Sequence, residues 1–122
     1  MENVEKIEFR ENLKIRLRQF VLDLIKLCKS LPREDDAIIL KKQLLRSGSS
    51  VYANYRAANR ARSKAEFFSK LSIVVEEADE TEMWLDLLIH SNISNNSETI
   101  KLYNESLEIL KIMATIRKRS SL

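Results

Sequence analysis

The 122-residue sequence contains only one glycine, one proline and one cysteine. Glycine and proline form most tight turns, so their scarcity argues against β-sandwiches, doubly wound α/β folds and glycine-rich phosphate loops. The single cysteine, Cys28, has no partner for an intrachain disulfide. This composition is typical of one small domain, residues 1–122, built from long helices with few connections.

Long hydrophobic runs are also missing. Asp86 interrupts the apolar stretch at residues 84–89, and no run approaches the roughly 20 apolar residues that a membrane helix needs. Glu2, Glu5 and Glu8 stand where a secretory signal peptide has its apolar segment. We therefore expect a cytoplasmic protein with no membrane partner.

The sequence lacks the residue patterns of known catalytic and metal sites. His90 is the only histidine, and there is no Glu-x-x-His motif of the kind that binds metal ions in helical bundles. The serines around Gly48 lack the G-x-S-x-G context of a hydrolase nucleophile. Cys28 falls beside an apolar helix face, where a cysteine is more often a small buried hydrophobe than a thiolate. We expect no enzymatic activity, no metal and no cofactor.

Apolar residues spaced three and four apart predict four helices, at residues 9–31, 34–60, 64–90 and 97–118. Pro32 ends the first helix, and Ser63 with Glu66 forms a capping box at the start of the third. Because short connections make neighbouring helices antiparallel, the prediction is an all-α, up-down-up-down four-helix bundle. The predicted core of the first helix is Leu13, Leu17, Phe20, Leu24, Leu27 and Leu31, and that of the fourth is Ile100, Tyr103, Leu107, Leu110 and Ala114.

Charge is distributed unevenly along the chain. Residues 37–75 contain eight Lys and Arg and one acid, whereas residues 76–98 contain seven acids and no Lys or Arg. A basic cluster can bind phosphates by releasing counterions, but it also fits a solvated face or a surface complementary to the acidic third helix of another subunit. Tyr52 and Tyr55 either stack on bases or pack within the bundle. The candidate nucleic-acid-binding residues are Lys41, Lys42, Arg56, Arg60, Arg62 and Lys64.

Two carboxylates, Glu77 and Glu80, interrupt an apolar edge of the third helix. If the turn between the second and third helices is centred near residues 61 and 62, Arg46 lies opposite Glu77. A half-buried acid needs a partner. The hypothesis is therefore a structural ion pair between Arg46 and Glu77.

Two apolar stripes remain after the core is assigned, and both lie on predicted outward faces. Contiguous apolar surface on a small domain usually marks an interface, so we expect a homo-oligomer. The predicted interface residues are Ile15, Leu22 and Ile25 on the first helix and Ile38, Leu45 and Tyr52 on the second.

Several motifs carry a resemblance to a known family. They are QLLRSGSSVYANYRAA at residues 43–58, RARSKAEF at 60–67 and KLSI at 70–73, followed by Glu77, Glu80 and Trp84-Leu85. Over residues 9–117 the chain resembles the bacterial four-helix-bundle proteins encoded in 23S rRNA intervening sequences. Met83 replaces the usual aromatic before the tryptophan, and Arg56 replaces an acid common in the family.

The resemblance implies a bundle that assembles as a ring-shaped homopentamer, with no firmly established function. A related group, the accessory proteins of diversity-generating retroelements, looks like the same assembly and works with a reverse transcriptase and its RNA. Two functions are therefore expected for this chain. One is non-catalytic binding of RNA or another nucleic acid through the basic residues, and the alternative is a scaffold that docks a protein partner such as a polymerase.

Overall fold

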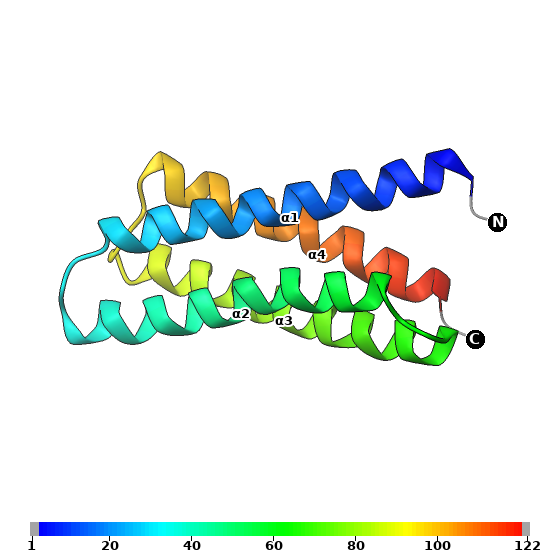
Figure 1. The fold of residues 1–122 in the computed structure, drawn as a ribbon. Coiled ribbons are helices and arrows are strands. Elements are labelled where there is room, and N and C mark those ends of the chain that lie inside the picture. The colour runs from blue at the N-terminus through cyan, green and yellow to red at the C-terminus, as the bar shows by residue number, and fades with distance from the viewer. Residues whose placement is uncertain (1–2, 121–122) are drawn as a thin grey trace.

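The computed structural model describes residues 3–120, and within that range it is all-α, with four helices and no strand. The helices are α1 (Val4–Ser30), α2 (Asp35–Asn59), α3 (Lys64–His90) and α4 (Ser97–Ser120). α3 packs against both α2 and α4, whereas α1 packs mainly against α2. Each connection reverses the direction of the chain, so the first turn of α1, the α2–α3 turn and the last turn of α4 lie at one end (Figure 1).

Local signals in the sequence set the helix ends. Leu31, just before Pro32, is the C-cap of α1. At the start of α3, the Ser63 hydroxyl accepts a hydrogen bond from the Glu66 backbone N–H at 3.0 Å, as the capping box predicts. The start of α1 was predicted wrongly at residue 9. The Asn3 side chain caps the Lys6 N–H at 2.8 Å and extends the helix back to Val4.

The core is one continuous cluster that contains residues of all four helices. Every predicted core residue of α1 is buried. The prediction for α4 was wrong by one position, because Ile100 is 44% exposed and Ala114 is also exposed. The buried residues of this helix are Thr99, Leu102, Ser106, Ile109 and Met113.

Two hydroxyls account for the error in α4. Thr99 and Ser106 occupy buried positions that a search for apolar residues passes over. Ser106 Oγ donates to the Tyr103 carbonyl at 2.6 Å, and Thr99 Oγ1 lies 2.6 Å from Ser94 Oγ. With their hydrogen bonds made locally, these side chains can be buried at little cost.

Gly48 lets α1 and α2 approach closely near the middle of α2. A Cβ atom built at this glycine would overlap Cδ1 of Leu24, which is fully buried. In the adjacent position, Thr81 of α3 donates from its hydroxyl to Ser47 Oγ at 2.9 Å. Small residues at 47 and 48 therefore bring α2 against α1 on one side and α3 on the other.

An ion pair also joins α1 to α4. The Arg16 guanidinium binds the Glu105 carboxylate through two hydrogen bonds, of 2.8 and 2.6 Å. Paired, coplanar contacts of this type fix orientation as well as distance. The pair therefore holds α1 beside α4, where apolar packing between the two helices is sparse.

Replacing Gly48 with valine is expected to lower the free energy of unfolding by about 1–3 kcal/mol, because the added side chain overlaps Leu24 in a filled core. Urea unfolding monitored by circular dichroism measures this change. The matched control is Ser49→Val on the exposed side of the same helix turn, since serine and valine have similar helix propensities. Equal unfolding free energies for the two variants would contradict a packing limit at Gly48.

Candidate nucleic-acid interface

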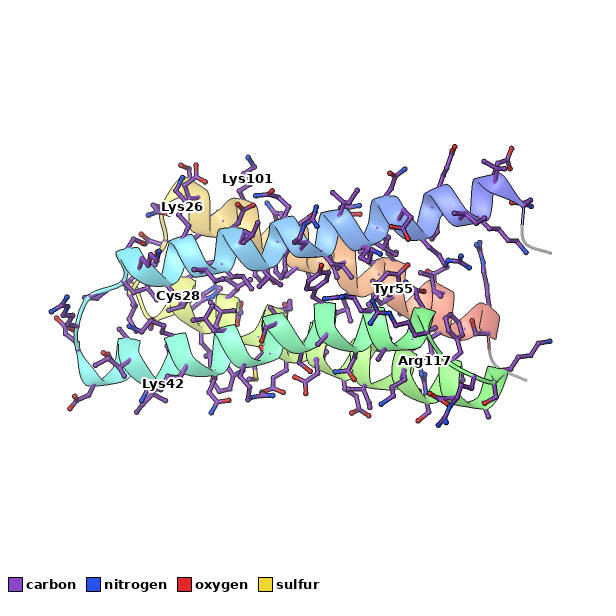
Figure 2. All side chains as sticks on the ribbon, viewed as in Figure 1. Lys26, Cys28, Lys42, Tyr55, Lys101 and Arg117 are labelled. Atoms are coloured by element: carbon purple, nitrogen blue, oxygen red, sulfur yellow. The ribbon has the colours of Figure 1, made fainter. Side chains whose placement is uncertain are left out.

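The six predicted cations do not form one surface. Arg56 and Arg60 lie at the C-terminal end of α2, and Arg62 and Lys64 lie in or beside the turn that follows. Lys41 and Lys42 lie toward the other end of the bundle, where Figure 2 shows Lys42 far from Arg117. Lys42 and Arg60 are separated by about 27 Å of helix at 1.5 Å per residue. The candidate interface therefore reduces to four of the six predicted residues.

Basic residues from other parts of the chain join these four at the same end of the bundle. They come from the start of α1 and the end of α4, which the fold places beside the α2–α3 turn. The sequence pattern alone assigned no role to Lys6, Arg10 or the C-terminal cluster at residues 117–119. We call this surface the basic end, and its residues are Lys6, Arg10, Arg56, Arg60, Arg62, Lys64, Arg117, Lys118 and Arg119.

The basic end contains both solvated and anchored cations. The Arg62 side chain is 90% exposed and lies 3.4 Å from the Glu66 carboxylate. Arg117 is held in place, because its guanidinium lies 4.9 Å from the centre of the Phe68 ring and its Nε donates to Ser72 Oγ at 2.9 Å. Exposed cations can rearrange to meet a phosphate, whereas Arg117 supplies a fixed charge between α3 and α4.

The two tyrosines of α2 have different environments. Tyr55 is only 2% exposed, which fits the packing role and leaves its ring no free face for a base. Tyr52 is half-buried, and the Arg56 guanidinium lies 5.5 Å from its ring centre. That distance is within the range of a cation–π contact, which holds Arg56 against the surface of α2.

Arg46 contacts two carboxylates of α3. Its Nη1 lies 3.2 Å from Glu77 Oε2, and its Nη2 binds Glu80 Oε1. The Trp84 indole N–H also donates to Glu80 at 3.1 Å. Hydrogen bonding from Arg46, more than any other cause, lowers the pKa of Glu80 below its ordinary value. Sequence reasoning placed Glu80 on this edge but did not assign it to Arg46.

The predicted interface stripes differ in exposure. On α1, Ile15 and Leu22 are each 51% exposed and Ile25 is 38% exposed, so this stripe has no cover within the chain. On α2, Leu45 and Tyr52 are partly buried against the core, and Ile38 is half-buried. The α2 stripe is therefore less exposed than the α1 stripe, because Leu45 and Tyr52 pack partly against the core.

The Cys28 side chain is buried in the helical core. Burial raises the pKa of the Cys28 thiol to about 11, so it is protonated at neutral pH. Over residues 3–120, no group of three or more His, Cys, Asp and Glu side chains could hold a metal ion. In the same range, no helix is both long and apolar enough to cross a membrane.

Comparison with known proteins identifies the family. The sequence profile described as 23S rRNA-intervening sequence protein matches residues 12–115, which include most of every helix. The chain belongs to this family. The resemblance carried by the motifs of α2 and α3 is thereby confirmed.

A solved structure supports the same assignment. It is a protein of unknown function from the S23 ribosomal protein family of Bacteroides thetaiotaomicron VPI-5482, and it is 39% identical to this chain. The match covers 86% of this chain and 97% of that one, with a TM-score of 0.79. Among curated proteins, the comparison finds no match.

The family motifs fall on the α2–α3 contact. Ser47 and Gly48 lie in the core, and Arg46 joins Glu77 and Glu80 at its edge. These residues therefore have a packing or pairing role in this member of the family. The same motifs also contain Arg56, Arg60, Arg62 and Lys64 of the basic end, so they cover both the α2–α3 contact and part of the basic end.

Replacing Arg46 with leucine is expected to lower the free energy of unfolding by about 1 kcal/mol at pH 7, the scale of a solvent-exposed ion pair. Because the folded state lowers the pKa of Glu80, this stabilisation is present above the ordinary glutamate pKa of about 4.3. It is lost as the pH falls through the lower folded-state pKa. The measurement is urea unfolding of both proteins at pH 7 and pH 3.

The control for Arg46→Leu is Lys42→Leu, which makes a similar change at an exposed position of the same helix. This control is expected to leave the unfolding free energy within about 0.5 kcal/mol of the wild type. If the deficit of Arg46→Leu were as large at pH 3 as at pH 7, the side chain would stabilise the bundle by packing and not by charge.

Proposed function

We propose that this protein is a non-catalytic, cytoplasmic, homo-oligomeric bundle that binds RNA or another nucleic acid through the basic end. The observation that carries the proposal is the convergence of cations from all four helices on one end of the molecule. Phosphate groups are the ligand that such a surface suits best, because each neutralised phosphate releases condensed counterions. Contacts to phosphate groups do not distinguish one base from another, so binding is expected to show little sequence preference.

The distribution of acidic residues also favours the basic end as the binding surface. Glu76, Glu77, Asp79 and Glu80 lie further along α3, away from its first turn. Glu5 and Glu66 are near the basic end but are outnumbered there by Lys and Arg. A nucleic acid approaching from this end meets net positive charge, whereas the middle of α3 repels it.

Oligomerisation would strengthen a weak basic surface. The exposed stripe of Ile15, Leu22 and Ile25 supplies an apolar contact for a second copy. A ring-shaped homopentamer, as the family resemblance implies, would repeat the basic end five times and bind by avidity. The resemblance to accessory proteins of diversity-generating retroelements, which work with RNA, favours the same partner.

Charge reversal tests the nucleic-acid proposal. Arg56→Glu, Arg60→Glu and Arg62→Glu in one variant are expected to weaken binding to a labelled RNA hairpin by at least tenfold at 50 mM salt. The wild type should lose affinity with rising salt, with a log–log slope of about −0.7 to −0.9 per neutralised phosphate. Fluorescence anisotropy over a salt series measures both quantities.

The matched control reverses three exposed lysines away from the basic end, with Lys26→Glu, Lys29→Glu and Lys101→Glu. It has the same net charge as the test variant and is expected to retain most of the affinity. Equal losses in both variants would show that net charge, and not the basic end, governs binding. Unchanged affinity in the test variant would exclude this surface.

The oligomer is tested separately by mass. Light scattering at micromolar concentration is expected to give a multiple of the 14.2 kDa chain mass, and five times that mass for the pentamer. Replacing Ile15 and Leu22 with glutamate should reduce the mass to that of one chain, because both residues are half-exposed in the bundle. A monomeric wild type would contradict the proposal.

A second function, a scaffold for a protein partner, is favoured by another set of exposed residues. Ile39, Met83 and Leu87 are 61%, 40% and 40% exposed on α2 and α3. Apolar side chains of this kind suit a protein surface better than a phosphate backbone. A partner captured by the protein and retained after nuclease treatment at high salt would favour this function over RNA binding.

A further inference from the structure

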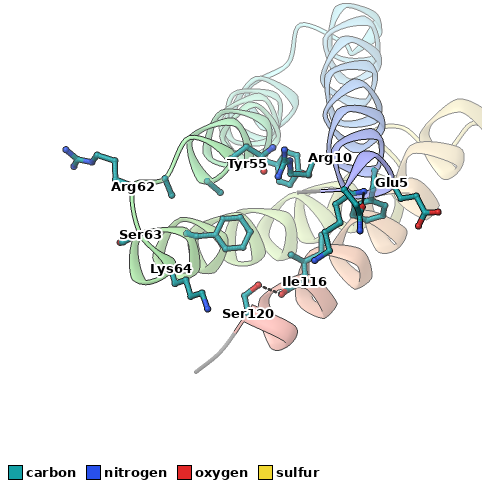
Figure 3. A pocket seen from close by; sticks show the side chains of 15 residues that line it. Glu5, Arg10, Tyr55, Arg62, Ser63, Lys64, Ile116 and Ser120 are labelled. Atoms are coloured by element: carbon teal, nitrogen blue, oxygen red, sulfur yellow. Dashed lines mark hydrogen bonds between the residues drawn. The ribbon is translucent and has the colours of Figure 1, made fainter. Parts of the chain in front are cut away.

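The bundle is open at its basic end. A cavity of about 790 Å³ lies between the first turns of α1, the end of α2, the start of α3 and the last turn of α4 (Figure 3). The opening exists because α1 has no buried residue before Leu13, while small residues, Ala58 and Ala61, line the facing wall. Its volume is within the range of small-molecule binding sites.

The cavity wall combines aromatic and cationic groups. Phe9 and Phe67 contribute ring surface, and Phe9 is 54% exposed although it is a large apolar side chain. Lys6, Arg10 and Lys64 line the same cavity. Among residues 3–120, Glu5 is the one acidic residue of the lining, and Figure 3 shows its carboxylate turned away from the cavity. A ligand that fits this wall is flat, apolar on its faces and attached to an anion.

Asn59 lies in the wall beside Tyr55. Its Oδ1 is buried and has no hydrogen-bond partner within residues 3–120, but its side chain also hydrogen-bonds Tyr55. Exchanging the amide oxygen and nitrogen would give Oδ1 the Tyr55 hydroxyl as a donor. Asn59 can therefore be satisfied within the wall, and the aromatic and cationic groups are what a ligand must fit.

Tyr55 and Arg10 lie beside Asn59. Burial raises the pKa of Tyr55, while the hydrogen bond with Asn59 and then the nearby charge of Arg10 oppose that shift. Figure 3 shows the two side chains side by side where α1 faces α2. The Arg10 guanidinium therefore stands at the boundary between the buried wall and the solvent, where it can meet a phosphate while the attached group enters the cavity.

We propose that the cavity binds one unpaired nucleobase of a bound RNA, with the base between Phe9 and Phe67 and its flanking phosphates near Arg10 and Lys64. A nucleobase with its flanking phosphates meets both features of the wall, the ring surface and the cationic charge. The inference rests on the proposed function, because Lys6, Arg10 and Lys64 belong to both the cavity and the basic end. It adds a preference for single-stranded over fully paired RNA.

The experiment uses two RNA hairpins that differ only in a 3′ overhang of three nucleotides. In one the overhang is adenosine with a central 2-aminopurine, and in the other all three nucleotides are abasic. The phosphates are the same in both, so only base contacts distinguish them. The wild-type protein is expected to bind the first about tenfold more tightly, the scale of stacking one base on aromatic side chains, and to change the 2-aminopurine fluorescence.

Two variants test the cavity itself. Phe9→Ala removes an exposed ring, and Ala61→Trp fills the space from the α2–α3 turn. Each is expected to bind the two hairpins with equal affinity while keeping the wild-type salt slope. The control is Ile39→Ala, an exposed apolar truncation near the start of α2, which should keep the tenfold preference. Circular dichroism and light scattering confirm that each variant keeps its fold and mass.

The outcomes separate this inference from the proposed function. Salt-dependent binding of both hairpins with equal affinity would overturn base insertion while leaving the basic end as the RNA-binding surface. Absence of binding to either hairpin at low salt would overturn both. A smaller oligomer in Phe9→Ala would show that a second copy covers this residue, and base insertion would be wrong.

Discussion

The close approach of α1 to α2 at Gly48 is the constraint on which the rest of the bundle depends. No side chain stands between the α2 backbone and Leu24, and the Ser47–Thr81 hydrogen bond fixes α3 at the same level of α2. The contacts at residues 47 and 48 therefore fix how α1 and α3 are aligned along α2. The register in turn brings Arg46 opposite Glu77 and Glu80, so the polar edge follows from the packing next to it.

The separation of charge in the molecule follows from the same geometry. A helix advances about 1.5 Å per residue, so a basic segment spread over residues 41–64 extends along much of the bundle. Only the last basic residues of this segment, which lie at or beside the turn between α2 and α3, are close together. Chain reversal then adds the two terminal helix ends, which lie more than a hundred residues apart in sequence. A surface made in this way belongs to the end of the bundle and not to any one helix.

The helices were predictable because their apolar spacing is regular and their caps are local. The core face of α1 repeats without polar interruptions, so the pattern indicates the correct positions there. In α4, Thr99 and Ser106 are buried with local hydrogen bonds, and the pattern favours the neighbouring stripe. Burial of a hydroxyl depends on its partner, which hydrophobicity alone does not reveal.

The candidate site was less predictable than the fold. Arg56, Arg60, Arg62 and Lys64 are close in sequence and remain together, whereas the proximity of Lys6 and Arg10 to them depends on how α1 packs. The cavity could not be predicted either. It forms because the first turns of α1 bury no side chain and the facing wall contains the small residues Ala58 and Ala61. The bidentate Arg16–Glu105 pair is a similar case, because its members are 89 residues apart.

The location of both chain ends has a practical consequence. Residues 3 and 120 both line the cavity at the basic end, so a purification tag or fused domain on either terminus would stand over this surface. The α3–α4 connection, residues 91–96, lies at the opposite end and contains exposed polar residues. A label inserted there leaves the whole basic end accessible.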